Sequence, residues 1–495
     1  MKYLQTATGE WEVVIGLEVH AQVISNAKLF SDASTKFGVA PNENVSFVDA
    51  ALPGVLPTIN SFCIDQTIKT GIGLNGTINL VSHFDRKNYF YADLPQGYQI
   101  SQYDNPIISN GYVEIETEDG GYKKINLERI HLEQDAGKSI HDQHPTQSYI
   151  DLNRCGIGLM EIVTKPDMRN AAEVSAFLHQ LRSILRYLKT CDGNMDEGSM
   201  RADVNVSVHR PETPYGTRVE IKNVNSIKFI VSAIDFEVNR QIEILDSGGV
   251  IDQETRLFDA ASGKTFVMRS KEDAQDYRYF PEPDLPPLRL QQSRIDAIRA
   301  TIPELPRAKV QRFQRELGLS FYDATTIVAE VEIADFYEKA LVANSNDINP
   351  DAVDEDFAKL LANWLVVELF SLLNRNGNSI SESKVSAENL GELVMLIKTD
   401  VISGKIAKDV LTIIWETGKN PATIVEEQGL RQITSVEAIE SALREALSEH
   451  IDKVAEYKNG KDKLFGFFVG QAMKKTEGKA NPQMLNDILK KLLSE

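Results

Sequence analysis

The chain has 495 residues, of which 42% are apolar and 25% charged, the composition of an ordinary folded protein of about three domains. No apolar run approaches the roughly 20 residues that a membrane-spanning helix needs, and no secretory signal pattern is visible, so we expect no membrane partner. The three cysteines are widely spaced, which argues against a disulfide framework and for a reducing, cytoplasmic location: Cys63, Cys155 and Cys191.

The formal charge of −19 opposes unspecific binding to nucleic acid, because proteins that bind phosphate backbones usually present a basic surface. The C-terminal segment differs from the rest, with nine lysines against six acidic residues between Ile451 and Glu495. RNA recognised by its shape on this locally basic tail is compatible with the composition.

The first part of the chain, up to about residue 290, alternates short strand patterns with two amphipathic helices. We expect strands at Val13–Val19, Lys124–Glu133, Tyr149–Asn153, Ala202–His209 and Thr217–Lys222. One helix is predicted to follow Asn170 and the other to follow Ser226, each with an apolar stripe of helical period.

A proline-rich stretch, Pro281–Pro287, breaks this pattern and indicates a stiff, ordered linker. From about Ser293 onward the sequence is almost wholly helical. The last helix is predicted to be capped by Asn481, with Pro482 in its first turn. The sequence therefore predicts an α+β first part and an all-α remainder.

Several apolar strand patterns of the first part contain acidic, amide or imidazole side chains two residues apart. Because side chains alternate along a strand, both members of a pair point to one face. The pairs are Glu18 and His20, His131 and Glu133, and Asp203 and Asn205; Glu161 lies alone within a further apolar run.

Carboxylates on such strands are costly unless they are paired or bind a cation. An oxygen-rich ligand set with one or two imidazoles suits Mg²⁺ or Mn²⁺ better than zinc. The alternative is a sheet with one face in water, as in many antiparallel proteins. Because three strands show the same pattern, the metal site and the water-facing sheet are about equally well supported.

Two stretches are rich in basic and aromatic residues, 85–91 (DRKNYFY) and 276–284 (DYRYFPEPD). Dense arginine, lysine and tyrosine can hold phosphate and stack on a base. The alternative is a packed turn with its tyrosine hydroxyls at the surface.

The same regions resemble a known family, the B subunits of the heterotrimeric aspartyl/glutamyl-tRNA amidotransferases. The resemblance runs in one register from about Val13 to about Leu493. Its motifs include VIGLEVHAQV, FDRKNYFYADLPQGYQISQYD, HLEQDAGKS, DLNRCGIGLMEIVTKPD, MDEGSMRADVNVSV, DYRYFPEPDLPPL and FGFFVGQAMKKTEGKANPQMLN.

The resemblance implies a ligase that forms a carbon–nitrogen bond with glutamine as amido donor. The partners it implies are an amidase-type A subunit that supplies ammonia, a small C subunit, and misacylated tRNA(Gln) or tRNA(Asn). It further implies ATP-dependent phosphorylation of the side-chain carboxylate of Glu-tRNA(Gln) and/or Asp-tRNA(Asn), with Mg²⁺ or Mn²⁺, followed by amidation.

The family's architecture implies three parts for this chain. We expect a mixed β-sheet cradle domain with helices over residues 1–292, which holds the ATP, the metal and the acceptor end of the tRNA. An all-α helical domain is expected over residues 293–408, and a small all-α tail domain that binds tRNA over residues 409–495.

The resemblance also implies roles for individual residues. The expected metal ligands are Glu18, His20, Glu133, Glu161 and Asp203. The expected catalytic residues are Glu18, Lys87 and Arg201, and those expected to bind the nucleotide are Lys87, Tyr89 and Arg201. The chain has Gln134 where some members have a second glutamate.

Two rival functions are compatible with the same residues. The first is a subunit that docks tRNA and has no catalysis of its own, which the basic tail and helical second part suit. The second is a metal-dependent hydrolase or nucleotidyltransferase, which would act without an amidase partner and without charged tRNA.

Overall fold

The computed structural model describes residues 3–270, 276–343 and 354–494. The chain divides into two compact units, Met1–Pro306 and Arg307–Glu495. Among the described helices, none is both long enough and apolar enough to cross a bilayer.

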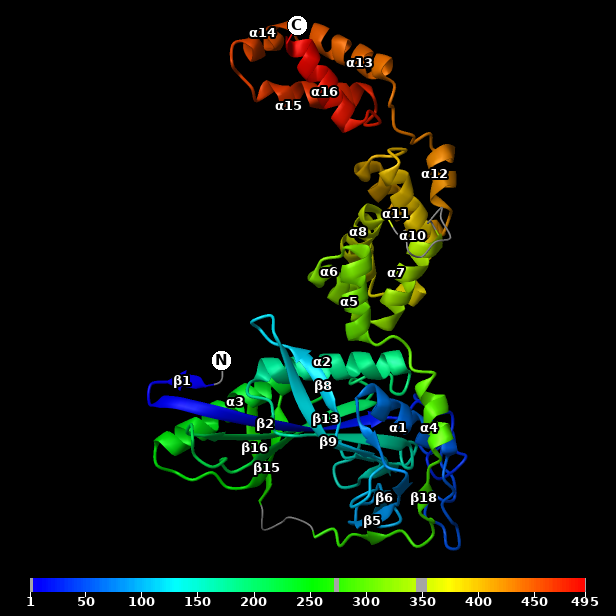
Figure 1. Ribbon diagram of the computed structural model, residues 1–495, viewed down its shortest axis with the longest axis vertical. Coiled ribbons are helices and arrows are strands. Elements are labelled where there is room, and N and C mark those ends of the chain that lie inside the picture. Colours follow the sequence, from blue (N-terminus) through cyan, green and yellow to red (C-terminus); the bar gives the residue numbers. More distant parts are fainter. Residues whose placement is uncertain (1–2, 271–275, 344–353, 495) are drawn as a thin grey trace. The chain divides into compact units, whose positions relative to one another are not determined.

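The first unit is built on an eleven-stranded mixed sheet (Figure 1). Its order is β16-β15-β14-β13-β2-β12-β9-β7-β3, with β1 paired to β2 and β8 to β9. All strand pairs are antiparallel except β14 and β15. The strands are β1 Leu4–Thr6, β2 Gly9–Gln22, β3 Thr77–Ile78, β7 Ile108–Ser109, β8 Tyr112–Glu116, β9 Tyr122–Gln134, β12 Gly158–Thr164, β13 Met200–His209, β14 Val219–Lys222, β15 Glu254–Asp259 and β16 Lys264–Ser270.

Apolar side chains of the central strands and of three helices form most of the core of the first unit, which includes Ile15, Leu17 and Val19 of β2. The helices are α1 Ser61–Gly73, α2 Ala171–Leu188 and α3 Ile227–Asp246. Asn170 and Ser226 cap α2 and α3, as predicted, by accepting hydrogen bonds from backbone N–H groups of the first turn.

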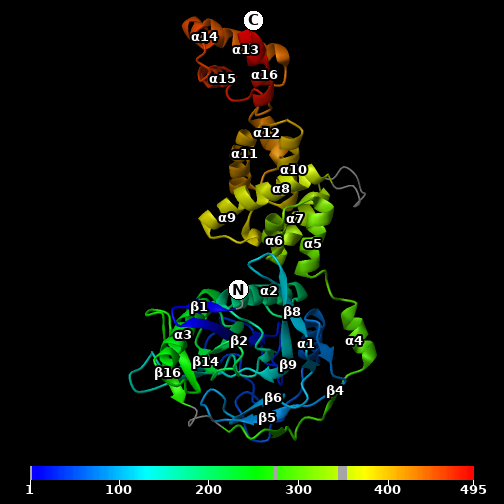
Figure 2. The same cartoon turned by 60° about the vertical axis from the view of Figure 1, so that its left-hand side comes forward.

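The other side of the sheet is partly covered by a small three-stranded sheet of order β17-β5-β6. In both Figure 1 and Figure 2, α2 and the strands β5 and β6 lie on opposite sides of the large sheet. The small sheet consists of β5 Asp85–Asn88, β6 Tyr98–Ser101 and β17 Phe280–Pro281. Two further pairs complete the unit: β4 Val81–Ser82 with β18 Leu288–Arg289, and β10 Lys138–Ile140 with β11 Tyr149–Asp151.

The proline-rich stretch is not the linker that we predicted. It belongs to the first unit, because β17 and β18 pair with β5 and β4 at its two ends, and Leu285 is buried between them. The following helix, α4 Gln292–Arg299, packs against α1 and buries Ile295 in the core. The division between the units therefore falls at Pro306 rather than at residue 292.

The second unit is helical throughout its described part, apart from turns and connections, which confirms the predicted α+β class with an all-α remainder. Its α-helices are α5 Pro306–Leu317, α6 Phe321–Val328, α7 Val331–Ala343, α8 Glu355–Asn363, α9 Phe370–Asn376, α10 Ala387–Lys398, α11 Gly404–Thr417, α12 Pro421–Glu427, α13 Val436–Ser448, α14 Ile451–Lys458, α15 Leu464–Lys475 and α16 Pro482–Ser494. A π-helical segment, Trp364–Leu369, joins α8 to α9, and a 3-10 turn covers Ile380–Glu382.

The predicted boundary at residue 408 falls inside α11, which packs against both α10 and α12. A separate apolar cluster lies further along the chain, where α13, α15 and α16 bury Leu443, Phe468 and Leu489 together. Since this cluster begins with α13, the tail has a core of its own only from about residue 436 onward. Asn481 caps α16, as predicted, by accepting hydrogen bonds from the N–H groups of residues 483 and 484.

Candidate active site

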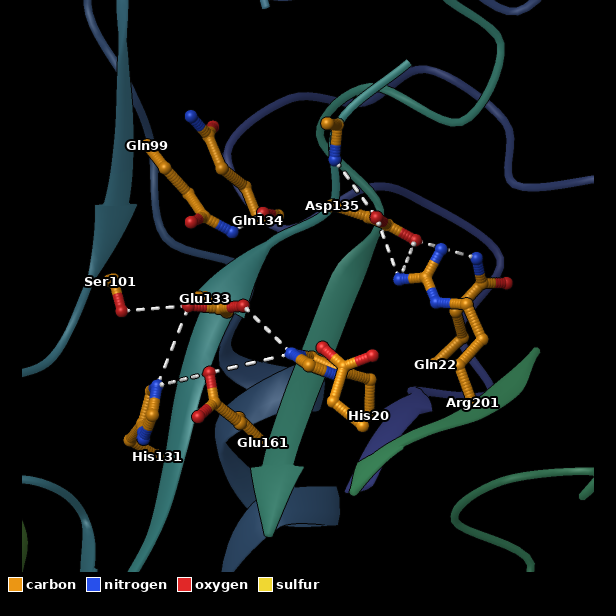
Figure 3. Close-up of polar contacts among 12 residues, drawn as sticks. His20, Gln22, Gln99, Ser101, His131, Glu133, Gln134, Asp135, Glu161 and Arg201 are labelled. Atoms are coloured by element: carbon orange, nitrogen blue, oxygen red, sulfur yellow. Dashed lines mark hydrogen bonds and ion pairs between the residues drawn. The ribbon is translucent and has the colours of Figure 1, made fainter. Parts of the chain in front are cut away.

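Strand β12 lies between β2 and β9, and its register decides which polar side chains meet. Glu161 is directly opposite His20 of β2 and directly opposite His131 of β9. Directly opposed residues of antiparallel strands point to the same face. Glu133 follows two positions after His131 and therefore shares that face as well. Figure 3 shows the four side chains converging.

The distances within this cluster are those of ion pairs between carboxylate oxygens and imidazole nitrogens. The Oε2 atom of Glu161 lies 3.5 Å from Nε2 of His20 and 3.2 Å from Nε2 of His131. The Glu133 carboxylate lies 3.4 Å from Nε2 of His131 and 4.0 Å from Nε2 of His20. Ser101 of β6 donates a hydrogen bond of 2.8 Å to Glu133, which links the small sheet to the cluster.

Burial makes the charges of the cluster interdependent. Although burial by itself would lower it, the pKa of His131 is raised to about 9 because the Glu161 and Glu133 carboxylates stabilise the imidazolium. Burial opposes ionisation of Glu161, yet the two imidazoles hold the pKa of Glu161 well below its usual value. The pKa of Glu133 is also lowered, against the effect of burial, by the neighbouring His131 imidazole.

Three of these residues could hold one cation. His20, Glu133 and Glu161 each offer a ligand atom, and these atoms all lie within 4.8 Å of one another. Both carboxylates are buried, so they are not an incidental surface pair. Two carboxylates and one imidazole suit Mg²⁺ or Mn²⁺, and these residues therefore fit the predicted metal.

Glu18 and Asp203 are not brought together with this trio. They are opposite one another in the next row of the sheet, where Asn205 donates to Glu18 over 3.1 Å and Lys222 lies 2.5 Å from Asp203. Burial and the neighbouring carboxylates, Glu161 first, raise the pKa of Glu18. A role for Glu18 and Asp203 as metal ligands stays a prediction.

Arg201 of β13 lies opposite His20, in the same row as the cluster. Its Nη2 atom donates to both carboxylate oxygens of Asp135, over 3.0 and 3.1 Å, and Gln22 donates to the same carboxylate over 2.9 Å. Asp135 is buried and is the residue that orients Arg201. We missed it in the sequence, although it continues the spacing of two that joins His131 and Glu133.

Lys87 of β5 is opposite Gln99 of β6 and shares a face of the small sheet with Ser101, which contacts Glu133, so Lys87 faces the cluster. Burial would lower the pKa of Lys87, but the nearby carboxylates of Glu133 and Glu161 raise it, so the ammonium group stays charged. The Nζ atom lies 5.1 Å from the centre of the Tyr277 ring. Tyr89 lies against Tyr277 with a ring-centre distance of 6.1 Å. The structure thus places the predicted nucleotide-binding residues Lys87 and Tyr89 on one side of the trio and Arg201 in its row.

Comparison with known proteins finds the family that the sequence motifs indicated, over nearly the whole chain. Residues 13–296 match the family described as GatB/GatE catalytic domain, and residues 350–493 match the one described as GatB domain. The aspartyl/glutamyl-tRNA(Asn/Gln) amidotransferase B subunits of Gluconobacter oxydans (strain 621H) and Acidiphilium cryptum (strain JF-5) are each 58% identical to it, over 99% of both chains. The protein of the same name from Granulibacter bethesdensis is 57% identical, again over 99% of both chains.

The matched catalytic domain contains every residue of the cluster described above. Because the sequence identity is this high along nearly the full length, the expected resemblance is confirmed. The chain belongs to the family of aspartyl/glutamyl-tRNA(Asn/Gln) amidotransferase B subunits.

Proposed function

We propose that this chain activates the side-chain carboxylate of Glu-tRNA(Gln) and/or Asp-tRNA(Asn) by phosphorylating it with ATP, so that ammonia can convert it to the amide. One observation carries the proposal: His20, Glu133 and Glu161 bring three ligand atoms within 4.8 Å of one another, and Lys87 faces them with a charged ammonium group. Carboxylates and a lysine around a divalent cation are the usual means of phosphoryl transfer.

The reaction requires this activation because a carboxylate has no good leaving group. In the first step a carboxylate oxygen bonds to the γ-phosphorus of ATP, and the bond from that phosphorus to the β,γ-bridging oxygen breaks, releasing ADP. In the second step the nitrogen of ammonia bonds to the acyl carbon, phosphate leaves with the electron pair of the broken C–O bond, and ammonia loses a proton. The product is Gln-tRNA(Gln) or Asn-tRNA(Asn).

His20, Glu133 and Glu161 would hold the Mg²⁺ or Mn²⁺ ion, which supplies charge neutralisation for the phosphate oxygens. Ser101 orients Glu133 through its hydrogen bond, and His131 balances the charge of both carboxylates. Lys87 faces the cluster, and the Glu133 and Glu161 carboxylates keep it protonated. It would therefore contact the transferred phosphoryl group. Arg201, held by Asp135, would bind a second phosphate, and Tyr89 the nucleotide.

The proposal includes partners and a location. The name that the relatives share denotes one part of a multi-subunit enzyme that acts on tRNA. We propose an amidase-type A subunit as the source of ammonia, a small C subunit, and the tail as a tRNA contact. The three cysteines are free and buried, which is compatible with a cytoplasmic protein.

The test uses the complex purified through a tag on the full chain, whose co-purifying subunits would identify the partners. With ATP, Mg²⁺, glutamine and Glu-tRNA(Gln), the natural chain should release ADP only when the charged tRNA is present. Glu161→Gln should reduce this release by at least about 100-fold while tRNA binding stays within about twofold. The matched control is Glu128→Gln on the same sheet, whose side chain is 56% exposed.

The outcomes separate the rival functions. ADP release that survives Glu161→Gln would leave the chain as a docking subunit. Activity on nucleotides without charged tRNA or partner subunits would instead indicate a hydrolase or nucleotidyltransferase.

A further inference from the structure

The proposed phosphoryl-transfer site is assembled from two separate sheets. His20, Glu133 and Glu161 lie on β2, β9 and β12 of the large sheet. Lys87 lies on β5, opposite Gln99 of β6, in the small sheet of order β17-β5-β6. Among the described strands, no backbone ladder joins the two sheets. The position of Lys87 relative to the trio therefore depends on side-chain contacts between the sheets.

Gln102, the first residue after β6, makes several such contacts at once. It is buried, with an exposed fraction of 2%. Its Oε1 atom accepts hydrogen bonds from the backbone N–H groups of Leu132, over 3.1 Å, and Ile107, over 3.2 Å. Its Nε2 atom donates to Oγ of Ser82 over 2.6 Å. Both ends of the amide are thus engaged, and one partner lies on β9 between two members of the active-site cluster.

The oxygen of Gln102 takes the place of a neighbouring strand at the edge of β9. In the described part of the chain, β7 pairs with β9 at two positions, the last being Ile108 with Ile130. N–H groups of alternate residues point to the same edge of a strand, so the next one on this edge belongs to Leu132. Gln102 accepts from it and from Ile107, the residue before β7. Because an unpaired buried N–H is costly, this side chain completes both strand ends.

Two further contacts from β6 surround the same point of β9. Ser101 donates to the carboxylate of Glu133 over 2.8 Å, and Gln99 donates to the backbone carbonyl of Gln134 over 2.7 Å (Figure 3). Three successive residues of β9 are therefore held from β6. Gln102 is the one whose side chain binds the backbone of β9 and of β7 together, so it fixes how β6 lies on the large sheet.

We propose that Gln102 is a positioning residue, whose amide sets the distance between Lys87 and the metal trio by fixing β6 against β9. This inference rests on the proposed function and adds a residue that touches neither substrate nor metal. An amide suits the position because it offers an acceptor and a donor without charge. A carboxylate there would add a third buried negative charge beside those of Glu133 and Glu161.

Loss of this amide should affect the rate of phosphoryl transfer more than the binding of metal. The trio is held on the large sheet by the ladder between β9 and β12, which places Glu133 opposite Leu159 and Leu132 opposite Met160. That ladder does not involve Gln102. The small sheet, by contrast, loses its buried attachment, and a shift of about 1 Å in a group that must face the reacting atoms can cost about 100-fold in rate.

The experiment uses the purified complex with Gln102→Met, which keeps the length of the side chain and removes its hydrogen bonds. The kcat of tRNA-dependent ADP release should fall at least about tenfold, while the dissociation constant for Mn²⁺ stays within about twofold. The matched control is Gln241→Met on α3, a fully buried glutamine whose amide also donates two hydrogen bonds. This control should lose stability to a similar extent and keep the natural kcat.

A milder variant, Ser82→Ala, removes only the acceptor of the Gln102 amide. It should lower kcat about threefold with unchanged Mn²⁺ binding, so the test stands even where Gln102→Met does not fold. Natural kcat in every folded variant would overturn the proposal. A loss of Mn²⁺ affinity as large as the loss of kcat would also overturn it, because the change would then act through the metal site.

Hydrogen exchange of the full chain supplies a readout that does not depend on activity. Peptides that contain the N–H groups of Ile107 and Leu132, and those that cover residues 85–101, should exchange at least about tenfold faster in Gln102→Met than in the natural chain or in Gln241→Met. Unchanged exchange would show that Gln102 does not attach the small sheet. If the natural complex releases no ADP with charged tRNA, the proposed function fails, and exchange alone decides whether Gln102 links the two sheets.

Discussion

Replacing Glu133 by glutamine tests the metal site without changing the size of the side chain. Glu133 is buried, its carboxylate approaches both imidazoles of the cluster, and it supplies one of the three ligand atoms that lie within 4.8 Å. Glutamine can still accept the hydrogen bond from Ser101, but it lacks the negative charge that a divalent cation requires. The variant should fold and should bind Mn²⁺ much more weakly.

The magnitude follows from the linkage of binding and stability. Mn²⁺ at about 100 times its dissociation constant stabilises the natural protein by ~2.7 kcal/mol. For a unit of this size that corresponds to a rise of about 5 °C in Tm. Loss of even an outer ligand contact weakens metal binding about 10- to 100-fold. With a 100-fold loss, the same Mn²⁺ concentration stabilises Glu133→Gln by only ~0.4 kcal/mol, less than about 1 °C.

The assay is differential scanning calorimetry of the full chain, first freed of metal with a chelator and then titrated with Mn²⁺. Glu128→Gln serves as the control, because it makes the same substitution on the same strand at a side chain that is 56% exposed. We expect this control to retain the full shift in Tm. Equal Mn²⁺-induced shifts in the two variants would refute the assignment of Glu133 to the metal site.

Three further predictions concern other parts of the chain. Asp135→Asn should lower the free energy of unfolding by about 3 kcal/mol in urea denaturation, because it breaks the partly buried pair with Arg201; equal stability of this variant and the exposed control Asp142→Asn would contradict that reasoning. Leu489→Ala should destabilise the tail by about 2–5 kcal/mol in the same assay, relative to Lys490→Ala, and leave the Mn²⁺-induced shift unchanged because the tail core is separate. Thiol reagents should react slowly with native protein at pH 8 and rapidly after unfolding, since burial raises the thiol pKa and so depletes the reactive thiolate at this pH. Rapid labelling of the native chain would contradict the burial of these thiols. The pKa is raised to about 11 for Cys63 and to about 12 for Cys155 and Cys191.

The local structure of this chain is largely determined by its sequence. The alternation around Glu18 and His20 predicted a strand with one polar face, and β2 has that arrangement because strand side chains alternate whatever surrounds them. Asn170 and Ser226 predicted the starts of α2 and α3, since a cap is a contact between residues three positions apart. The order of motifs along the chain was sufficient to identify the family.

Which residues meet was decided only by the tertiary structure. Nothing local to Glu161 indicates that its strand pairs between β2 and β9, yet this pairing places it against His20 and His131 and leaves Glu18 and Asp203 one row away. The proline-rich stretch looked like a linker for the same reason, because its strand partners lie about 200 residues earlier. Register and long-range pairing depend on the burial of whole faces of the sheet, a free energy to which each residue contributes only in the assembled fold.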